Sequence, residues 1–106
     1  MKVLFDQGTP VPLRRQLPGH QVRTAYEMGW GELSNGDLLK AAEAEFDLLV
    51  TTDQNLSYQQ NLAGRRLAIL VLPTTSWPKI SRHASFVAEA VGQMQPGDYR
   101  ELVFSP

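Results

Sequence analysis

The apolar residues of the chain fall into short, unbroken runs. Three such runs occupy residues 3–5, 48–50 and 67–72. Continuous apolarity over so few residues is typical of strands that are buried on both faces, as in a parallel sheet covered by helices. Residues 20–25 alternate more between apolar and polar and predict an outer strand, and residues 99–104 predict a last strand at an edge of the sheet.

Helical patterns separate these runs, as the crossovers between parallel strands require. Residues 34–45 have apolar side chains at helical spacing and begin with Ser34 and Asp37 in the arrangement of a capping box. Three further helices are predicted over residues 12–17, 53–63 and 78–94, of which the last is the longest. The pattern therefore predicts a single α/β domain over residues 1–106, with a mostly parallel five-stranded sheet flanked by helices in a three-layer, Rossmann-like arrangement.

Composition narrows the chemistry that this domain can perform. The 106 residues include no cysteine, which excludes disulfides, zinc-thiolate sites and a thiol nucleophile, so a metal would be held by oxygen atoms or by His20 and His83. The net charge of −1 means that nucleic-acid binding would depend on local basic patches. No stretch approaches the roughly 18 apolar residues of a membrane span, and we expect a soluble, cytoplasmic protein that does not bind a membrane.

Acidic residues follow two of the buried runs. Asp6 comes directly after the first run, and Asp53 follows Thr51 and Thr52 at the end of another. The carboxyl ends of parallel strands line one crevice, and we expect the two carboxylates to face each other there, with Asp37 as the third acid. Oxygen ligands without cysteine favour Mg²⁺ or Mn²⁺ over zinc. The alternatives stay open, because Asp53 can cap a helix, Asp6 can close an Asx turn and Asp37 can be the capping partner of Ser34.

Basic pairs and amides are the candidate contacts for phosphates. A polar amide, Asn55, follows Asp53, and Asn35 precedes Asp37. Most such residues are ordinary cap, turn or solvated surface positions, and the two Trp residues, which can stack on bases, are more often part of the core. The candidate nucleic-acid contacts are Arg14, Arg15, Asn55, Arg65 and Arg66.

The order of these pieces resembles a known family over nearly the whole chain. The features are the strand ending in Asp6, the loop at residues 27–30, the segment 34–42 and the segment 49–56 around Asp53. Together they resemble the PIN-like domain family of unknown function, which is related to the PIN ribonuclease toxins of toxin-antitoxin systems. The resemblance implies a PIN-like sheet, a Mg²⁺ or Mn²⁺ site formed by Asp6, Asp37 and Asp53, and hydrolysis of RNA. It also implies an antitoxin protein as a candidate partner and leaves a homodimer open.

The chain departs from the family pattern at two positions, and these departures leave alternative functions open. Related sequences often have a second acid beside the first and another two residues after the third, where this chain has Gln7 and Asn55. Fewer negative ligands weaken the binding of a hard cation, so a catalytically inactive module that binds RNA or a partner protein is the alternative. A phospho-acceptor signalling domain is disfavoured, because it needs an acid beside Asp6 and a lysine after the last strand.

Overall fold

Five parallel strands form one sheet in the computed structural model, which describes residues 1–59 and 62–105. Their order across the sheet is β2-β1-β3-β4-β5, and every neighbouring pair is parallel. The predicted interior position of the first strand and the edge position of the last are confirmed, and the sheet is fully rather than mostly parallel. The strands are β1 (Lys2–Phe5), β2 (Gln21–Thr24), β3 (Leu48–Thr51), β4 (Ala68–Val71) and β5 (Tyr99–Glu101).

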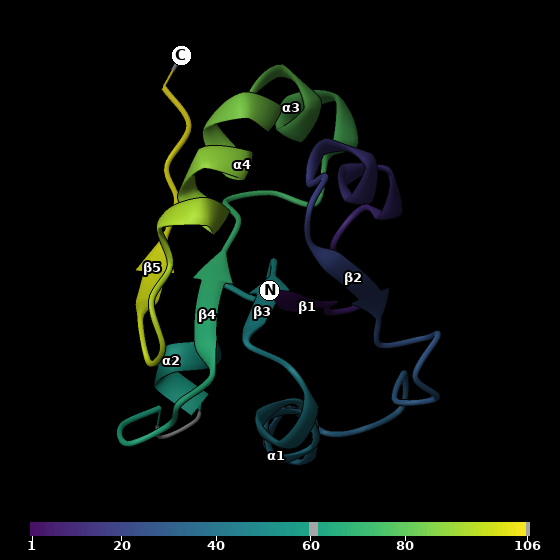
Figure 1. Ribbon diagram of the computed structural model, residues 1–106, viewed down its shortest axis with the longest axis vertical. Coiled ribbons are helices and arrows are strands. Elements are labelled where there is room, and N and C mark those ends of the chain that lie inside the picture. The colour runs from purple at the N-terminus through teal and green to yellow at the C-terminus, as the bar shows by residue number, and fades with distance from the viewer. Residues whose placement is uncertain (60–61, 106) are drawn as a thin grey trace.

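Helices cover both faces of the sheet and complete the predicted three layers. The 3₁₀ helix η1 (Val11–Gln16) lies with α3 (Trp77–Arg82) and α4 (Ala84–Gln93) above the sheet in Figure 1. The other two helices, α1 (Asn35–Glu45) and α2 (Leu56–Gln59), lie below it. None of the helices in the described part of the chain is long and apolar enough to cross a membrane.

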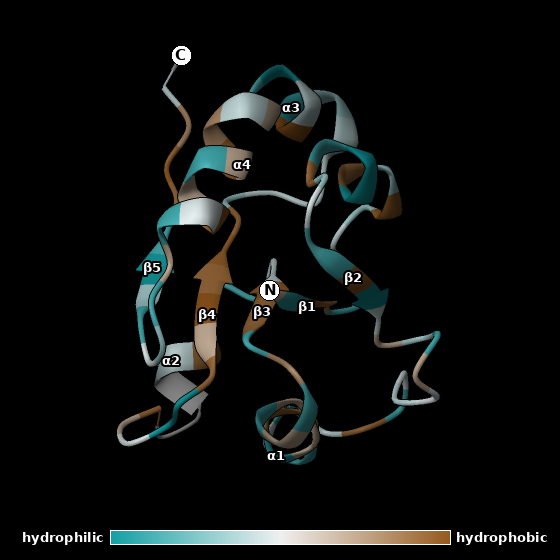
Figure 2. Cartoon of the chain, in the orientation of Figure 1, coloured by the Kyte–Doolittle hydropathy of each residue, from teal (hydrophilic) through white to brown (hydrophobic). Residues whose placement is uncertain are grey.

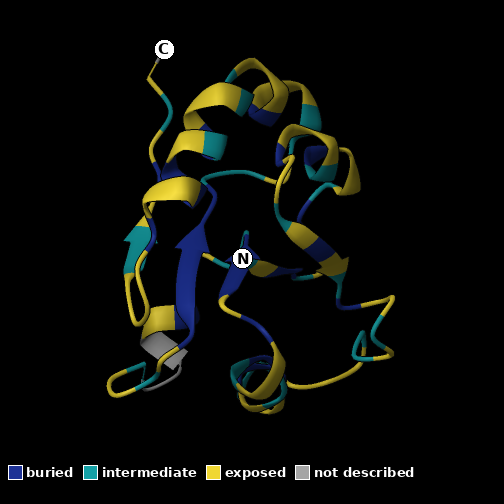
Figure 3. Cartoon of the chain, viewed as in Figure 1, coloured by how far each residue is buried: buried dark blue, intermediate teal, exposed yellow. Residues whose placement is uncertain are grey.

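Each face of the sheet has its own apolar cluster. The upper cluster joins Phe5 and Val50 to Leu13 of η1 and Val87 of α4, and the lower cluster includes Leu49. Successive strand residues point to opposite faces, so a strand between two helical layers must be apolar at every position. All four residues of β3 and of β4 are buried, as the dark blue strand in Figure 3 illustrates. Figure 2 shows the corresponding hydrophobic colouring of β4.

The predicted helix over residues 78–94 is two helices that meet at His83. An α-helix would pair the His83 N–H with the carbonyl of Lys79, but that carbonyl contacts His83 Nδ1 at 3.0 Å. The His83 N–H bonds instead to the carbonyl of Ile80 at 2.9 Å, which tightens and ends α3. The imidazole ring stacks on Phe104 with 4.3 Å between ring centres. The break between α3 and α4 is thus accompanied by a contact between His83 and Phe104, which follows β5. The helical spacing of apolar residues in the sequence does not reveal such a contact.

Two other elements are shorter than predicted. The helix expected over residues 53–63 begins only at Leu56, the first residue of α2. Asp53 Oδ1 accepts the Asn55 N–H at 2.9 Å and holds residues 53–55 in a turn before it. Residues 60–61 of the expected helix lie outside the described part of the chain. The expected strand over residues 99–104 ends at Glu101. Beyond it Leu102 still bonds to the carbonyl of Val71 at 2.8 Å, and Phe104 turns onto His83.

Candidate functional site

Asp6 and Asp53 meet at the carboxyl edge of the sheet through the side chain of Thr51. The strand order reverses between β1 and β3, and at such a reversal the loops leave the sheet in opposite directions and open a crevice. The Thr51 hydroxyl donates to Asp6 Oδ2 at 2.8 Å and accepts the Asp53 N–H at 3.1 Å. Thr51 is fully buried, so this connection is shielded from water. The two acids are therefore separated by only two hydrogen bonds.

Both carboxylates also organise their own loops. Asp6 Oδ1 accepts the Gln7 N–H at 2.7 Å, while the Asp6 carbonyl accepts the Thr9 N–H at 3.1 Å. Asp53 Oδ1 accepts the Asn55 N–H, and Asp53 Oδ2 accepts from the Asn35 amide at 3.1 Å. Asp53 thus closes a side-chain turn with Asn55 ahead of α2 rather than capping a longer helix, and the turn at Asp6 is closed by its backbone carbonyl. These hydrogen bonds, together with the one from Thr51, give each carboxylate oxygen one partner, and a carboxylate oxygen has room for another.

The loops after β1, β3 and β4 approach one another closely at this edge. Gly8 has a φ of +59°, and a Cβ atom placed there would lie 2.5 Å from Thr52 Oγ1 and 3.7 Å from Thr75 Cγ2. A side chain at position 8 would therefore push apart the loops that hold Asp6 and Asp53. Ser76, in the third loop, accepts the Lys79 N–H at 3.4 Å and so caps the start of α3.

Asp37 belongs to the neighbouring helix and is not linked to the other two acids by a hydrogen bond in the described residues. Its N–H donates to Ser34 Oγ at 3.3 Å, which is the N-cap contact expected from the sequence, and its side chain is exposed. Two positions earlier, Asn35 reaches Asp53. Among residues 1–59 and 62–105, no group of three or more His, Asp or Glu side chains is arranged to hold a metal ion.

Arg14, one of the predicted phosphate contacts, is engaged by Glu27. Its two terminal nitrogens lie 3.2 and 2.7 Å from the two Glu27 oxygens, a bidentate pair. The hydrogen bond from Arg14, followed by that from the Thr24 N–H, lowers the pKa of Glu27. Arg14 therefore braces the turn after β2. Its neighbour Arg15 is exposed at the end of η1.

The other arginine pair lies at the opposite edge of the sheet. Arg65 and Arg66 precede β4, and Arg66 Nη1 lies 4.0 Å from Asp47 at the start of β3. Arg66 also donates to the Glu43 carbonyl at 2.9 Å. The structure does not bring this pair to the carboxylates. Asn55, by contrast, is exposed beside Asp53 and has its backbone bonded to it.

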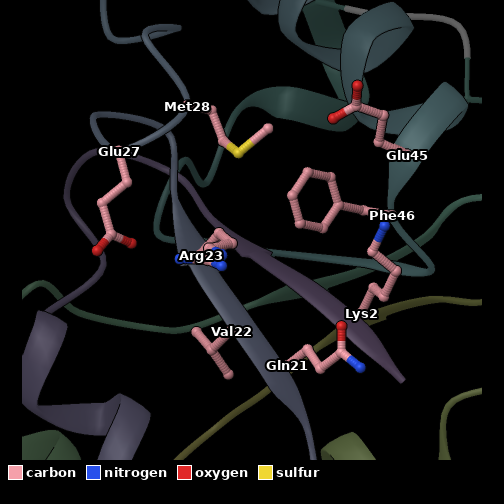
Figure 4. Close-up of a pocket in the computed structure, with 8 residues that line it drawn as sticks. All are labelled: Lys2, Gln21, Val22, Arg23, Glu27, Met28, Glu45 and Phe46. Carbon is pink, nitrogen blue, oxygen red and sulfur yellow. The ribbon is translucent and has the colours of Figure 1, made fainter.

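Two cavities flank the turn after β2. One, of about 590 Å³, lies beside Asp6 and is lined by the loop after β1, by η1 and by residues 24–27. The other, of about 640 Å³, lies between β1, β2 and the end of α1 and includes Lys2, Arg23, Glu45 and Phe46 (Figure 4). Lys2 Nζ lies 5.7 Å from the centre of the Phe46 ring. Because Asp6 lines the first cavity, whereas neither Asp6 nor Asp53 is part of the lining given for the second, we place the candidate site at the first.

Both Trp residues pack against the core, as the sequence favours, whereas an aromatic residue that was not among the candidates lies near Asp6. Trp30 packs edge-to-face on Phe46, with 6.0 Å between ring centres, and Trp77 packs against the upper cluster. Both Trp residues therefore support the core. Tyr26, which was not among the candidates, is 82% exposed and lines the cavity beside Asp6. The sequence signal that could have identified Tyr26 is the position of an aromatic residue directly after the predicted outer strand, next to a polar residue.

The fold and the site define a doubly wound parallel α/β protein with two acidic residues, Asp6 and Asp53, joined through Thr51 at its strand-order reversal. Comparisons with protein-family models, with curated proteins and with solved structures find no match for this chain. The functional argument therefore depends on the geometry of the site.

Proposed function

We propose that the protein is a metal-dependent ribonuclease of PIN-like type that uses Asp6 and Asp53 to bind Mg²⁺ or Mn²⁺. One observation carries the proposal: at the strand-order reversal the buried Thr51 hydroxyl joins the Asp6 carboxylate to the backbone N–H of Asp53, and neither acid forms an ion pair with a cationic side chain in the described residues. Two such negative charges are stabilised by a shared cation. The resemblance to the PIN-like family supplies RNA as the substrate and Asp37 as a further acid.

The donors available at the site fit Mg²⁺ or Mn²⁺. Asp6 and Asp53 offer four carboxylate oxygens, each with one hydrogen bond already made. Mg²⁺ is commonly held by one or two carboxylates together with waters and substrate phosphates, so a third acid is not required. When bound, such an ion lowers the pKa of a coordinated water and neutralises charge on the phosphodiester.

The chain itself contributes orientation to this chemistry. Thr51 and Gln7 hold the Asp6 carboxylate from both of its oxygens, and Asn35 and Asn55 do the same for Asp53. Carboxylates fixed in this way do not have to reorganise when charge develops near them. Asn55, exposed beside Asp53, is placed to donate to a neighbouring phosphate oxygen.

The test is the substitution Asp53→Asn. Asn keeps the shape and the turn-forming ability of Asp but removes the charge. We expect the variant to fold, to lose Mn²⁺ binding measured by calorimetry, and to lose cleavage of single-stranded RNA that the wild type shows in Mn²⁺ but not in EDTA. Asp47→Asn is the matched control, because Asp47 also accepts a backbone N–H, from Lys2 at 2.8 Å, at the opposite edge of the sheet. Retained cleavage by Asp53→Asn would refute the proposal.

An inactive module that binds RNA or a partner protein, such as an antitoxin, is the second candidate. The specific observation in its favour is the pair Gln7 and Asn55 at positions where related sequences often have acids, together with the lack of a three-acid group in the described residues. A wild-type protein that folds, binds RNA and cleaves it with none of Mg²⁺, Mn²⁺ and Co²⁺ would select this candidate.

A further inference from the structure

The cavity beside Asp6 is lined in part by an exposed aromatic residue, Tyr26. Its volume of about 590 Å³ lies in the range of small-molecule sites. Asp6, Gln7, Thr9, Val11 and Tyr26 are among the residues that line it. Tyr26 is 82% exposed and Val11 53% exposed. A large apolar surface thus lies open next to the proposed reaction centre.

The turn that holds Tyr26 is braced from several directions. The N–H of the preceding residue, Ala25, donates to the carbonyl of Phe5 at 2.8 Å, and the Tyr26 carbonyl accepts the Gly29 N–H at 3.0 Å. The residue after it, Glu27, is fixed by the bidentate contact with Arg14. Glu27 and Thr24 also exchange hydrogen bonds between side chain and backbone, at 2.9 and 3.0 Å. The backbone that carries this exposed ring is therefore ordered in advance, which lowers the entropy lost when a ligand binds.

The charges of the cavity select a neutral, planar occupant. Among the described residues, the lining contains the acids Asp6 and Glu27 and one cation, Arg14, which is paired with Glu27. A phosphate would be repelled from the interior of the cavity, whereas a nucleobase has no charge and can stack on an aromatic ring. At the Asp6 end, a phosphodiester held by the proposed metal would place the adjoining base at the cavity mouth.

We infer that this cavity is a nucleobase subsite in which an unpaired base of the RNA stacks on Tyr26, next to the phosphodiester bound at Asp6 and Asp53. The inference rests on the proposed function and deepens it, because it makes single-stranded RNA the substrate class. Base-paired RNA keeps its bases stacked in the helix and cannot supply one to this cavity without unpairing.

The experiment is a thermodynamic cycle of RNA binding: it measures whether the effect of Tyr26→Ala on affinity depends on the presence of bases in the RNA. Binding of a fluorescein-labelled RNA pentanucleotide and of the same ribose-phosphate chain without bases is measured by anisotropy, with Ca²⁺ in place of Mn²⁺ and intact RNA verified on a gel. We expect base removal to weaken binding to the wild type about tenfold, and to have little further effect on Tyr26→Ala. Tyr26→Phe should bind like the wild type. Circular dichroism verifies that each variant is folded.

Phe86→Ala is the matched control, because Phe86 is an aromatic residue of α4 that is 38% exposed and lies outside the cavity. Removal of the bases should weaken RNA binding to Phe86→Ala as much as it weakens binding to the wild type. If base removal and Tyr26→Ala weaken binding independently, or if the wild type binds both oligonucleotides equally or neither, the inference is overturned.

The outcomes separate this inference from the proposed function. If the two losses of affinity are coupled but the wild-type protein fails to cleave RNA in Mg²⁺, Mn²⁺ or Co²⁺, the base subsite is retained and the nuclease activity is refuted. If the protein cleaves RNA in a metal-dependent way but the effects of Tyr26→Ala and of base removal are independent, the nuclease activity is retained and the base subsite is refuted.

Discussion

At the scale of single residues, the buried Thr51 hydroxyl is the group on which the site depends most. We predict that Thr51→Val lowers the free energy of unfolding by about 1–3 kcal/mol, since it leaves the Asp53 N–H and the Asp6 carboxylate without their partner. It should also weaken Mn²⁺ binding about tenfold, because outer groups that orient metal-binding carboxylates typically have effects of this size. Urea unfolding and titration calorimetry measure the two quantities.

Thr9→Val separates these two effects. Thr9 is likewise buried, and its hydroxyl donates to the Val50 carbonyl at 3.0 Å, but it contacts neither carboxylate. It should lose a similar amount of stability and bind Mn²⁺ like the wild type. If both variants bound Mn²⁺ equally well, Thr51 would have only a structural role.

At the scale of elements, the pair Arg14 and Glu27 ties η1 to the turn after β2 and makes that connection sensitive to pH. The pKa of Glu27 is lowered from its usual 4.5 by the Arg14 and Thr24 hydrogen bonds. The unfolded chain therefore binds the proton more readily, so the stabilisation is complete above the unfolded pKa and is lost as the pH falls through the lower, folded pKa. We predict that the thermal midpoint of the wild type falls more between pH 7 and pH 3 than that of Glu27→Gln.

Other groups contribute to the same pH profile and have to be separated from Glu27. The pKa of His20 is lowered from 6.5, first by burial and then by the N-terminal amine, so its contribution also diminishes as the pH falls, but in both proteins alike. Glu32→Gln controls for the removal of one exposed carboxylate. Parallel profiles for the wild type and Glu27→Gln would contradict the prediction.

At the scale of the whole molecule, the two apolar clusters share the same strands and should unfold together. Leu49 faces the lower cluster and Val50 the upper one, although they are neighbours in β3. We predict that Leu49→Ala lowers the free energy of unfolding by about 2–5 kcal/mol and shifts a single urea transition without changing its slope. Val103→Ala, at a position 78% exposed, should change it by less than about 0.5 kcal/mol. Two separate transitions would show that the layers fold independently.

Much of this architecture follows from local patterns in the sequence. The runs at residues 3–5, 48–50 and 67–72 are too short and too uniformly apolar for surface helices, and they are the central strands. The positions of Asp6 and Asp53 after two such runs were sufficient to place both at one edge of the sheet, because parallel strands end on the same side. The capping of α1 by Ser34 was also predictable, since it depends on residues three apart.

Local sequence patterns are enough to predict the fold class, the central strands and the edge at which the acids lie, because these depend on the solvent preference and spacing of nearby residues. Four features depend instead on tertiary contacts: the link from Asp6 to Asp53 through Thr51, the pairing of Arg14 with Glu27, the break in the last helical segment at His83 and the exposure of Tyr26. Most of these features pair groups that are distant in the chain. Such pairs form only when the sheet has set the distances between loops, and a periodic pattern of residues contains no information about those distances.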